Sequence, residues 1–154
     1  MDLEGIRKSL LQTDRHSSTN SDLTVQGLIS NWSKRTPDAI AIASPGRFPL
    51  TYSDLNSQIE KTVRTLNEFG LGRNDRVAMV LPNGPELAVA FLSVISGATC
   101  APLNPDYRAR ELDFYLSDLK PKALVFQEGM ESAALEIVKR QGITPIRLAP
   151  MREE

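Results

Sequence analysis

The chain has 154 residues, 41% of them hydrophobic and 24% charged, with a formal net charge of −1. These proportions are those of a folded domain, and the near-neutral charge argues against a nucleic-acid or anionic-membrane partner. One cysteine excludes an intramolecular disulfide, and one cysteine with one histidine excludes the usual zinc sites. The acidic start is unlike a signal peptide and no apolar run reaches the about 18 residues of a membrane span, so we expect a cytoplasmic protein without a transmembrane segment.

The first 22 residues are predicted to form an N-terminal helical arm and a polar joint. Apolar residues recur at helical spacing within residues 1–12, at Leu3, Ile6, Leu10 and Leu11. Residues 13–22 are polar and rich in serine and threonine, as in flexible joints. We therefore treat residues 1–22 as an arm and expect residues 23–154 to fold as one α/β subdomain.

A helix and a short hairpin are predicted next. The helix covers residues 25–35 and is stopped by Pro37. One of its faces is apolar, formed by Val25, Leu28, Ile29 and Trp32. Residues 39–43 and 48–50 are expected to pair with each other around a turn at Pro45-Gly46.

A second, longer helix follows the hairpin. Thr51 and Asp54 resemble a capping box at its start, and Gly70 can take the left-handed conformation that ends a helix. Its apolar stripe consists of Leu55, Ile59, Val63, Leu66 and Phe69. The spacing of these residues by three and four predicts an amphipathic helix between the two signals.

From Arg76 onward, short apolar runs alternate with helical patterns. The runs cover residues 77–81, 99–103, 123–126 and 144–148, and the helical patterns cover residues 86–96, 109–119 and 131–141. This alternation predicts βαβ units, with a mostly parallel sheet covered on both faces and right-handed crossovers. The fold class is therefore α/β. The helix over residues 86–96 is apolar almost all round and is expected to be deeply buried.

Phosphate-binding loops are not evident. Gly70-Leu71-Gly72 has Asp75 where a third glycine would be needed, and it precedes a strand rather than a helix. The loop from Pro82 to Glu86 could present amides to an anion at a helix start, but Pro82 and Pro85 remove two of those amides. We favour an ordinary connecting loop there.

Catalytic side chains are also not evident. His16 lies in the polar joint with nothing to orient it, and Cys100 lies in a predicted strand where burial raises a thiol pKa. Glu111, Asp113 and Asp118 could suggest acid–base chemistry, but a solvated helix face opposite the apolar stripe explains them more simply.

A further group of polar residues follows a strand. Asn104, Asp106 and Tyr107 come after the run at residues 99–103, where open parallel sheets place ligands. The simpler interpretation is a helix-capping turn, in which Asp106 favours the helix N-terminus. We therefore predict no catalytic, cofactor-binding or metal-binding residue in this chain.

Several segments, taken in order, resemble the AMP-forming acyl-activating ligases. The segment Leu50-Thr51-Tyr52-Ser53-Asp54-Leu55 is similar to the first core motif of that family, and Val94-Ile95-Ser96-Gly97-Ala98-Thr99-Cys100-Ala101-Pro102-Leu103-Asn104-Pro105 is similar to its second. The connecting segments Asp75-Arg76-Val77-Ala78 and Leu81-Pro82-Asn83 are also typical of the family. The resemblance covers residues 23–150, and the Asn104-Pro105 ending favours CoA synthetases over amino-acid-activating domains.

The resemblance implies a two-step reaction for a complete enzyme. A carboxylate attacks ATP to give an acyl-adenylate and pyrophosphate, and a thiol then takes the acyl group. The implied cofactors are ATP, Mg and CoA or a carrier thiol. The family's phosphate loop, ribose-binding aspartate and mobile lysine have no matching position in this sequence. We therefore expect a scaffold fragment that needs no cofactor and does not adenylate alone.

Two other interpretations stay open. The chain could be a stand-alone α/β binding or assembly module derived from that family, or a different α/β enzyme, which no motif supports. The expected partner is the remainder of a ligase or another copy of this chain. Because such a fragment would leave apolar surface uncovered, we expect a homo-oligomer when it is isolated, formed for example by exchange of the N-terminal arm.

Overall fold

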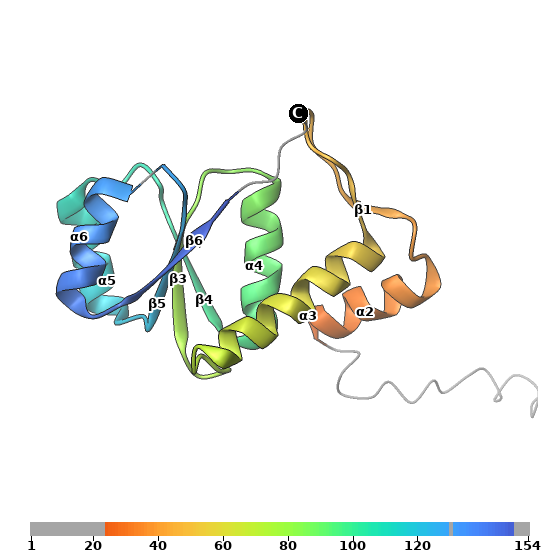
Figure 1. The fold of residues 1–154 in the computed structure, drawn as a ribbon, viewed down its shortest axis with the longest axis horizontal. Coiled ribbons are helices and arrows are strands. Elements are labelled where there is room, and N and C mark those ends of the chain that lie inside the picture. The colour runs from red at the N-terminus through yellow and green to blue at the C-terminus, as the bar shows by residue number, and fades with distance from the viewer. Residues whose placement is uncertain (1–23, 130, 150–154) are drawn as a thin grey trace, which may run out of the picture.

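The structure is a computed structural model and describes residues 24–129 and 131–149 (Figure 1). The predicted arm and joint, including His16, lie outside these residues. The elements in chain order are α2 (Val25–Arg35), β1 (Ile40–Ile42), β2 (Leu50–Thr51), α3 (Tyr52–Glu68), β3 (Arg76–Val80), α4 (Pro85–Gly97), β4 (Thr99–Leu103), α5 (Ala109–Leu119), β5 (Ala123–Gln127), α6 (Glu131–Gln141) and β6 (Thr144–Leu148). No helix in this part of the chain is long and apolar enough to cross a membrane.

The larger sheet has four parallel strands in the order β4-β3-β5-β6. Helix α4 connects β3 to β4 on one face, and α5 and α6 make the next two connections on the other face (Figure 1). Strands β4 and β5 lie on opposite sides of β3, so the connection from β4 to β5 runs across the sheet in the direction opposite to the connection from β3 to β4. The two connecting helices, α5 and α4, lie on opposite faces of the sheet. Crossovers of a single hand require this combination. The predicted α/β class and parallel sheet are confirmed.

Alternate residues of each strand supply the two halves of the core. Val77 and Met79 of β3 face α3 and α4, whereas Ala78 and Val80 face α5 and α6. Since both faces of β3 are covered, its sequence is a continuous apolar run rather than an alternating one. On β5, Phe126 is fully buried and packs on the face that α5 and α6 cover.

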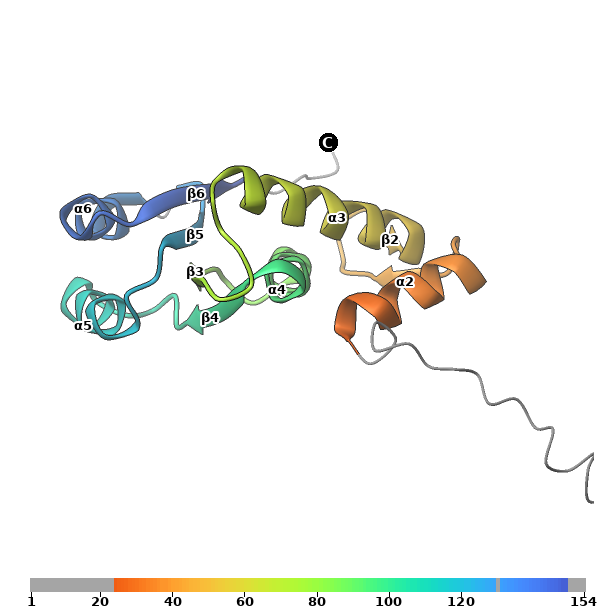
Figure 2. The ribbon, with the colours of Figure 1, turned by 90° about the horizontal axis from the view of Figure 1, so that it is seen from below.

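A third apolar cluster joins the N-terminal elements to this domain. Ile29 of α2 packs with Leu55 and Ile59 of α3, and the β1–β2 hairpin closes over them. Figure 2 shows α2 lying along α3 at the end of the molecule opposite α5 and α6. Long helix α3 thus belongs to two clusters, because its C-terminal Leu66 packs on the sheet.

The ends of α3 follow the sequence signals. Thr51 Oγ1 accepts a hydrogen bond from the backbone N–H of Asp54 at 3.1 Å. Gly70 has φ +72°, the left-handed conformation expected after the helix. Gly97, by contrast, is the last residue of α4 and does not have positive φ. A Cβ there would lie 3.1 Å from Val63 of α3, so this glycine permits close packing of α3 on α4.

One expectation about burial needs correction, and two apolar faces are less buried than their composition suggests. Only Ala90, Ser93 and Val94 of α4 are buried, because this helix covers one half of a sheet face and its other side is exposed at Phe91. Phe69, assigned to the stripe of α3, is 61% exposed because it lies past the helix end. On the apolar face of α2, only Ile29 is buried.

Both edge strands carry a proline at a position that faces away from the sheet. Thr99 and Thr144 donate inward, to the carbonyls of Asp75 and Lys122, each at 2.9 Å. Along each strand, alternate residues direct their backbone N–H and C=O groups to opposite sides. Pro102 of β4 and Pro145 of β6 are at the positions whose backbone groups face away from the sheet. Each proline removes an N–H that an added strand would use, which weakens edge-to-edge pairing.

The cap of α3 gives a first prediction. Replacing Thr51 by alanine removes the acceptor for the Asp54 N–H and should lower the free energy of unfolding by about 1 kcal/mol. Urea denaturation followed by circular dichroism measures this. Ser57→Ala, an exposed change inside the same helix, is the control and should stay within about 0.5 kcal/mol of the parent. Equal effects of the two changes would contradict a capping role.

Candidate functional site

The connections of the sheet single out one edge as the place for a ligand. The connection that follows β3 goes to one face, and those that follow its neighbours β4 and β5 go to the other. In open α/β sheets such a divergence leaves a crevice beyond the carboxyl ends of the strands. The loops after β3 and β4, residues 81–84 and 104–108, lie at this edge.

The start of α4 already carries a carboxylate. Gly84 precedes the helix without a side-chain cap, and Pro85 occupies its first position. Glu86 Oε1 lies 2.6 Å from Arg47 Nε of the β1–β2 loop. A negative charge in the first helical turn is stabilising there and disfavours a second anion at the same amides. This arrangement agrees with the interpretation of residues 82–86 as a connecting loop.

The polar turn after β4 caps α5. Asn104 Oδ1 accepts from the N–H of Asp106 at 2.9 Å, and Glu111 Oε2 accepts from the N–H of Arg108 at 2.9 Å. The capping interpretation holds, but the carboxylate that caps is Glu111 rather than Asp106. Its position three residues into the helix was a local signal for this contact.

Tyr107 of the same turn is paired with another aromatic ring. It stacks on Tyr115 of α5 with ring centroids 4.8 Å apart and an interplanar angle of 13°. The hydrogen bond between the two hydroxyl groups raises the pKa of Tyr107, with burial as the smaller cause. Tyr107 therefore fixes the turn against α5.

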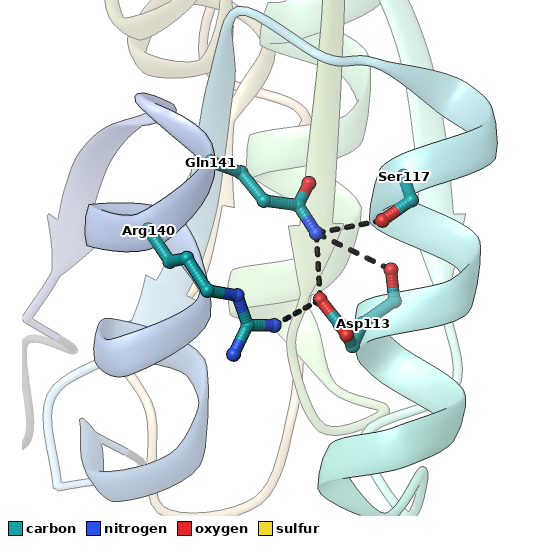
Figure 3. Close-up of polar contacts among 4 residues, drawn as sticks. All are labelled: Asp113, Ser117, Arg140 and Gln141. Carbon is teal, nitrogen blue, oxygen red and sulfur yellow. Dashed lines mark hydrogen bonds and ion pairs between the residues drawn. The ribbon is translucent and has the colours of Figure 1, made fainter.

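Asp113 joins the two helices on the far face of the sheet. Its Oδ1 accepts from Arg140 at 2.5 Å and from Gln141 Nε2 at 2.7 Å, and Gln141 also reaches Ser117 at 2.9 Å (Figure 3). The expectation of a solvated face holds for exposed Asp118. Asp113 is also partly exposed, but it has structural partners 27 and 28 residues away, for which there was no local signal in the sequence.

The amino-terminal edge of the sheet is held by Asp75. Its Oδ2 accepts from the N–H of Gly72 at 2.9 Å, and its Oδ1 lies 2.6 Å from Lys122 Nζ. The hydrogen bond from Lys122 is the main cause of a lowered pKa for Asp75, and the bond from Gly72 adds to it. Asp75, the first residue of the connecting segment Asp75-Arg76-Val77-Ala78, thus links the starts of β3 and β5.

Cys100 of β4 is half-buried, and burial raises the pKa of its thiol to about 11. The predicted raised pKa is confirmed, and the side chain behaves as part of the core beside α4. Among residues 24–129 and 131–149, no three His, Cys, Asp or Glu side chains are grouped so as to hold a metal ion.

Comparison with known proteins agrees with this arrangement. A family model described as AMP-binding enzyme matches residues 29–151. The chain belongs to the AMP-binding enzyme family. The oxalate–CoA ligase of Arabidopsis thaliana is 37% identical over 125 residues, which are 80% of this chain and 24% of that protein. A dimodular nonribosomal peptide synthase of Bacillus subtilis is 29% identical over 129 residues, covering 79% of this chain and 5% of that protein.

Solved structures of the family share the fold. ATP-bound MatB from Rhodopseudomonas palustris superimposes with a TM-score of 0.70 at 26% identity, covering 81% of this chain and 25% of that one. The N-terminal subdomain of NpsA from Klebsiella oxytoca gives 0.61 at 24% identity, covering 73% and 30%, which shows the fold alone. This AMP-binding enzyme chain thus spans about a quarter of the length of the CoA ligase and of MatB.

The thiol of Cys100 gives a second prediction. A pKa of about 11 against an ordinary value of 9.0 leaves about 100-fold less thiolate near pH 8, so alkylation by iodoacetamide should be about 100-fold slower than for the same chain in urea. The rate should rise as the pH approaches 11. Labelling followed by mass spectrometry measures both rates, and equal rates would show that the thiol is not buried.

Proposed function

We propose that this chain is the N-terminal scaffold of an ATP-dependent, AMP-forming carboxylic acid–thiol ligase, and that residues 1–154 alone do not adenylate an acid. In this proposal residues 23–154 form the subdomain and residues 1–22 an appended arm. ATP, Mg and CoA, or a carrier thiol, serve the complete enzyme. The Asn104-Pro105 ending of the second motif favours CoA as the acceptor.

The observation that carries the proposal is that residues of the family's motifs make contacts that hold helices, strands and turns in place. Thr51 starts α3, Asp75 ties Gly72 and Lys122 together, and Asn104 forms the turn before α5. These contacts hold elements in place, which favours a structural role for the three residues. Family membership over residues 29–151 supplies the reaction class, and these contacts supply the scaffold role.

The described residues do not fit Mg-ATP by themselves. The start of α4, where backbone amides could face a phosphate, already carries the carboxylate of Glu86, and a negative charge in this turn disfavours a second anion. We therefore assign phosphate and metal binding to polypeptide outside this chain. A stand-alone binding or assembly module is the second candidate, favoured by the core that the chain builds on both faces of its sheet.

Exchange of pyrophosphate into ATP tests the proposal. The isolated chain should give no acid-dependent exchange above a no-acid control. A chimera in which residues 29–149 replace the matching quarter of the Arabidopsis oxalate–CoA ligase should show oxalate-dependent exchange, because the scaffold is shared. Exchange by the isolated chain would refute its inactivity, and a folded chimera without exchange would refute the scaffold role and favour the separate module.

The isolated chain is also expected to self-associate. On α2, Val25, Leu28 and Trp32 are 43%, 54% and 43% exposed and lie on one helix face, and such a stripe favours association. Light scattering at high protein concentration should show a dimer or larger species. Leu28→Lys should shift the population toward monomer, and a parent chain that stays monomeric would contradict the expectation.

A further inference from the structure

Helices cover the two faces of the sheet unequally. On one face α5 and α6 pack over β3 and β5, with Phe126, Ile137 and Val138 buried between them. On the other face α3 and α4 cover β3, but Ile146 and Leu148 of β6 are only partly buried. A hollow of about 270 Å³ lies there, walled by α3 and α4 and floored by β5 and β6.

A second hollow of about 350 Å³ adjoins the first. It lies between the β1–β2 hairpin, the start of α4 and the end of β6. Gln58, Val89 and Leu148 line both hollows, so the two form one channel, which we name the α3–β6 groove. Both hollows lie beside β6, on the face of the sheet that α3 and α4 cover.

The groove has an apolar floor with one buried polar group. Val94, Val125 and Ile146 line it, together with the hydroxyl-bearing Ser93 of α4. Ser93 is 1% exposed, and its Oγ has no hydrogen-bond partner among residues 24–129 and 131–149. A buried hydroxyl left unpaired costs free energy, so an occupant that supplies a donor or acceptor would recover it. A polar residue between Leu92 and Val94 was the sequence signal for this position.

The chain itself leads into the groove. Leu148 ends β6, and both Leu148 and Ala149 line the hollow beside the hairpin. Ala149, the last described residue, therefore lies at the groove. The matched relatives are about four times as long as the segment that they share with this chain.

We propose that the α3–β6 groove is the docking face for the polypeptide that follows β6 in the longer AMP-binding enzymes, and that this polypeptide supplies the hydrogen-bond partner of Ser93. The inference rests on the proposed function. It fixes the surface through which the scaffold engages the rest of a ligase. Lys61 on the groove wall favours an acidic group near the apolar side chains of the docked segment.

Cysteine accessibility tests the proposal without reference to activity. Thr65 is exposed on the groove wall, whereas Asn67 is exposed on a different side of α3. In a Cys100→Ala background, maleimide should modify Thr65→Cys at least about tenfold more slowly in the chimera than in the isolated chain, because docking covers it. Asn67→Cys should react within about twofold in both. Equal protection factors for the two positions overturn the proposal, even if the chimera is active.

Co-purification in trans provides a second arm, which decides the matter if the chimera does not fold. The chain is co-expressed with the tagged remaining three quarters of the Arabidopsis ligase. Val89→Glu places a charge in the groove and should reduce recovery at least about tenfold, whereas Phe114→Glu, at a 66% exposed position of α5 outside the groove, should keep it within about twofold. No recovery of the parent chain, or equal loss by both variants, overturns the proposal. Protection of Thr65→Cys in a dimer of the isolated chain assigns the groove to a second copy and also overturns it.

Discussion

Burial of β3 on both of its faces is the constraint on which the rest of the structure depends. Val77, Ala78 and Met79 have no exposed surface, so helices must lie on each side of the strand. Helix α4 supplies one cover as it connects β3 to β4, and the chain then crosses to the other face to deliver α5 and α6. Helix α3, which precedes the sheet, completes the first cover and links the sheet to the α2–hairpin cluster.

Polar side chains hold the ends of these elements. Asp75 and Lys122 fix the starts of β3 and β5, and Asn104 and Glu111 fix the turn between β4 and α5. These positions lie at element boundaries, where backbone N–H groups lack partners of their own. Motif residues such as Asp75 and Asn104 therefore serve the fold of the described chain.

Helices cover the two faces of the sheet unequally, so a domain with its own core still has an open apolar surface. The face beneath α5 and α6 is closed, whereas the face beneath α3 and α4 leaves the α3–β6 groove beside β6. Pro102 and Pro145 meanwhile discourage strand addition at the two sheet edges. In the described chain, the helix faces and the groove are therefore more open to a partner than the sheet edges are.

The sequence by itself determined the local structure. Apolar periodicity set the helices and strands, with β4, α5 and β6 at their predicted bounds, and the signals at Thr51 and Gly70 set the ends of α3. These features depend on neighbours within a few residues, which a sequence pattern records. The resemblance to a ligase family could also be recognised from the sequence, because each motif is a short contiguous segment that holds the end of a helix or strand.

Only the tertiary structure decided the strand order, the partners of Asp113 and the exposure of α4. Asp113 meets Arg140 and Gln141 because α5 and α6 lie on the same face, and Gly97 is small because α3 crosses α4 at that point. An apolar helix is deeply buried only if other elements surround it, and α4 has the sheet on one side and a groove beside it. Such contacts join residues tens of positions apart, so the pattern around each residue carries no record of them.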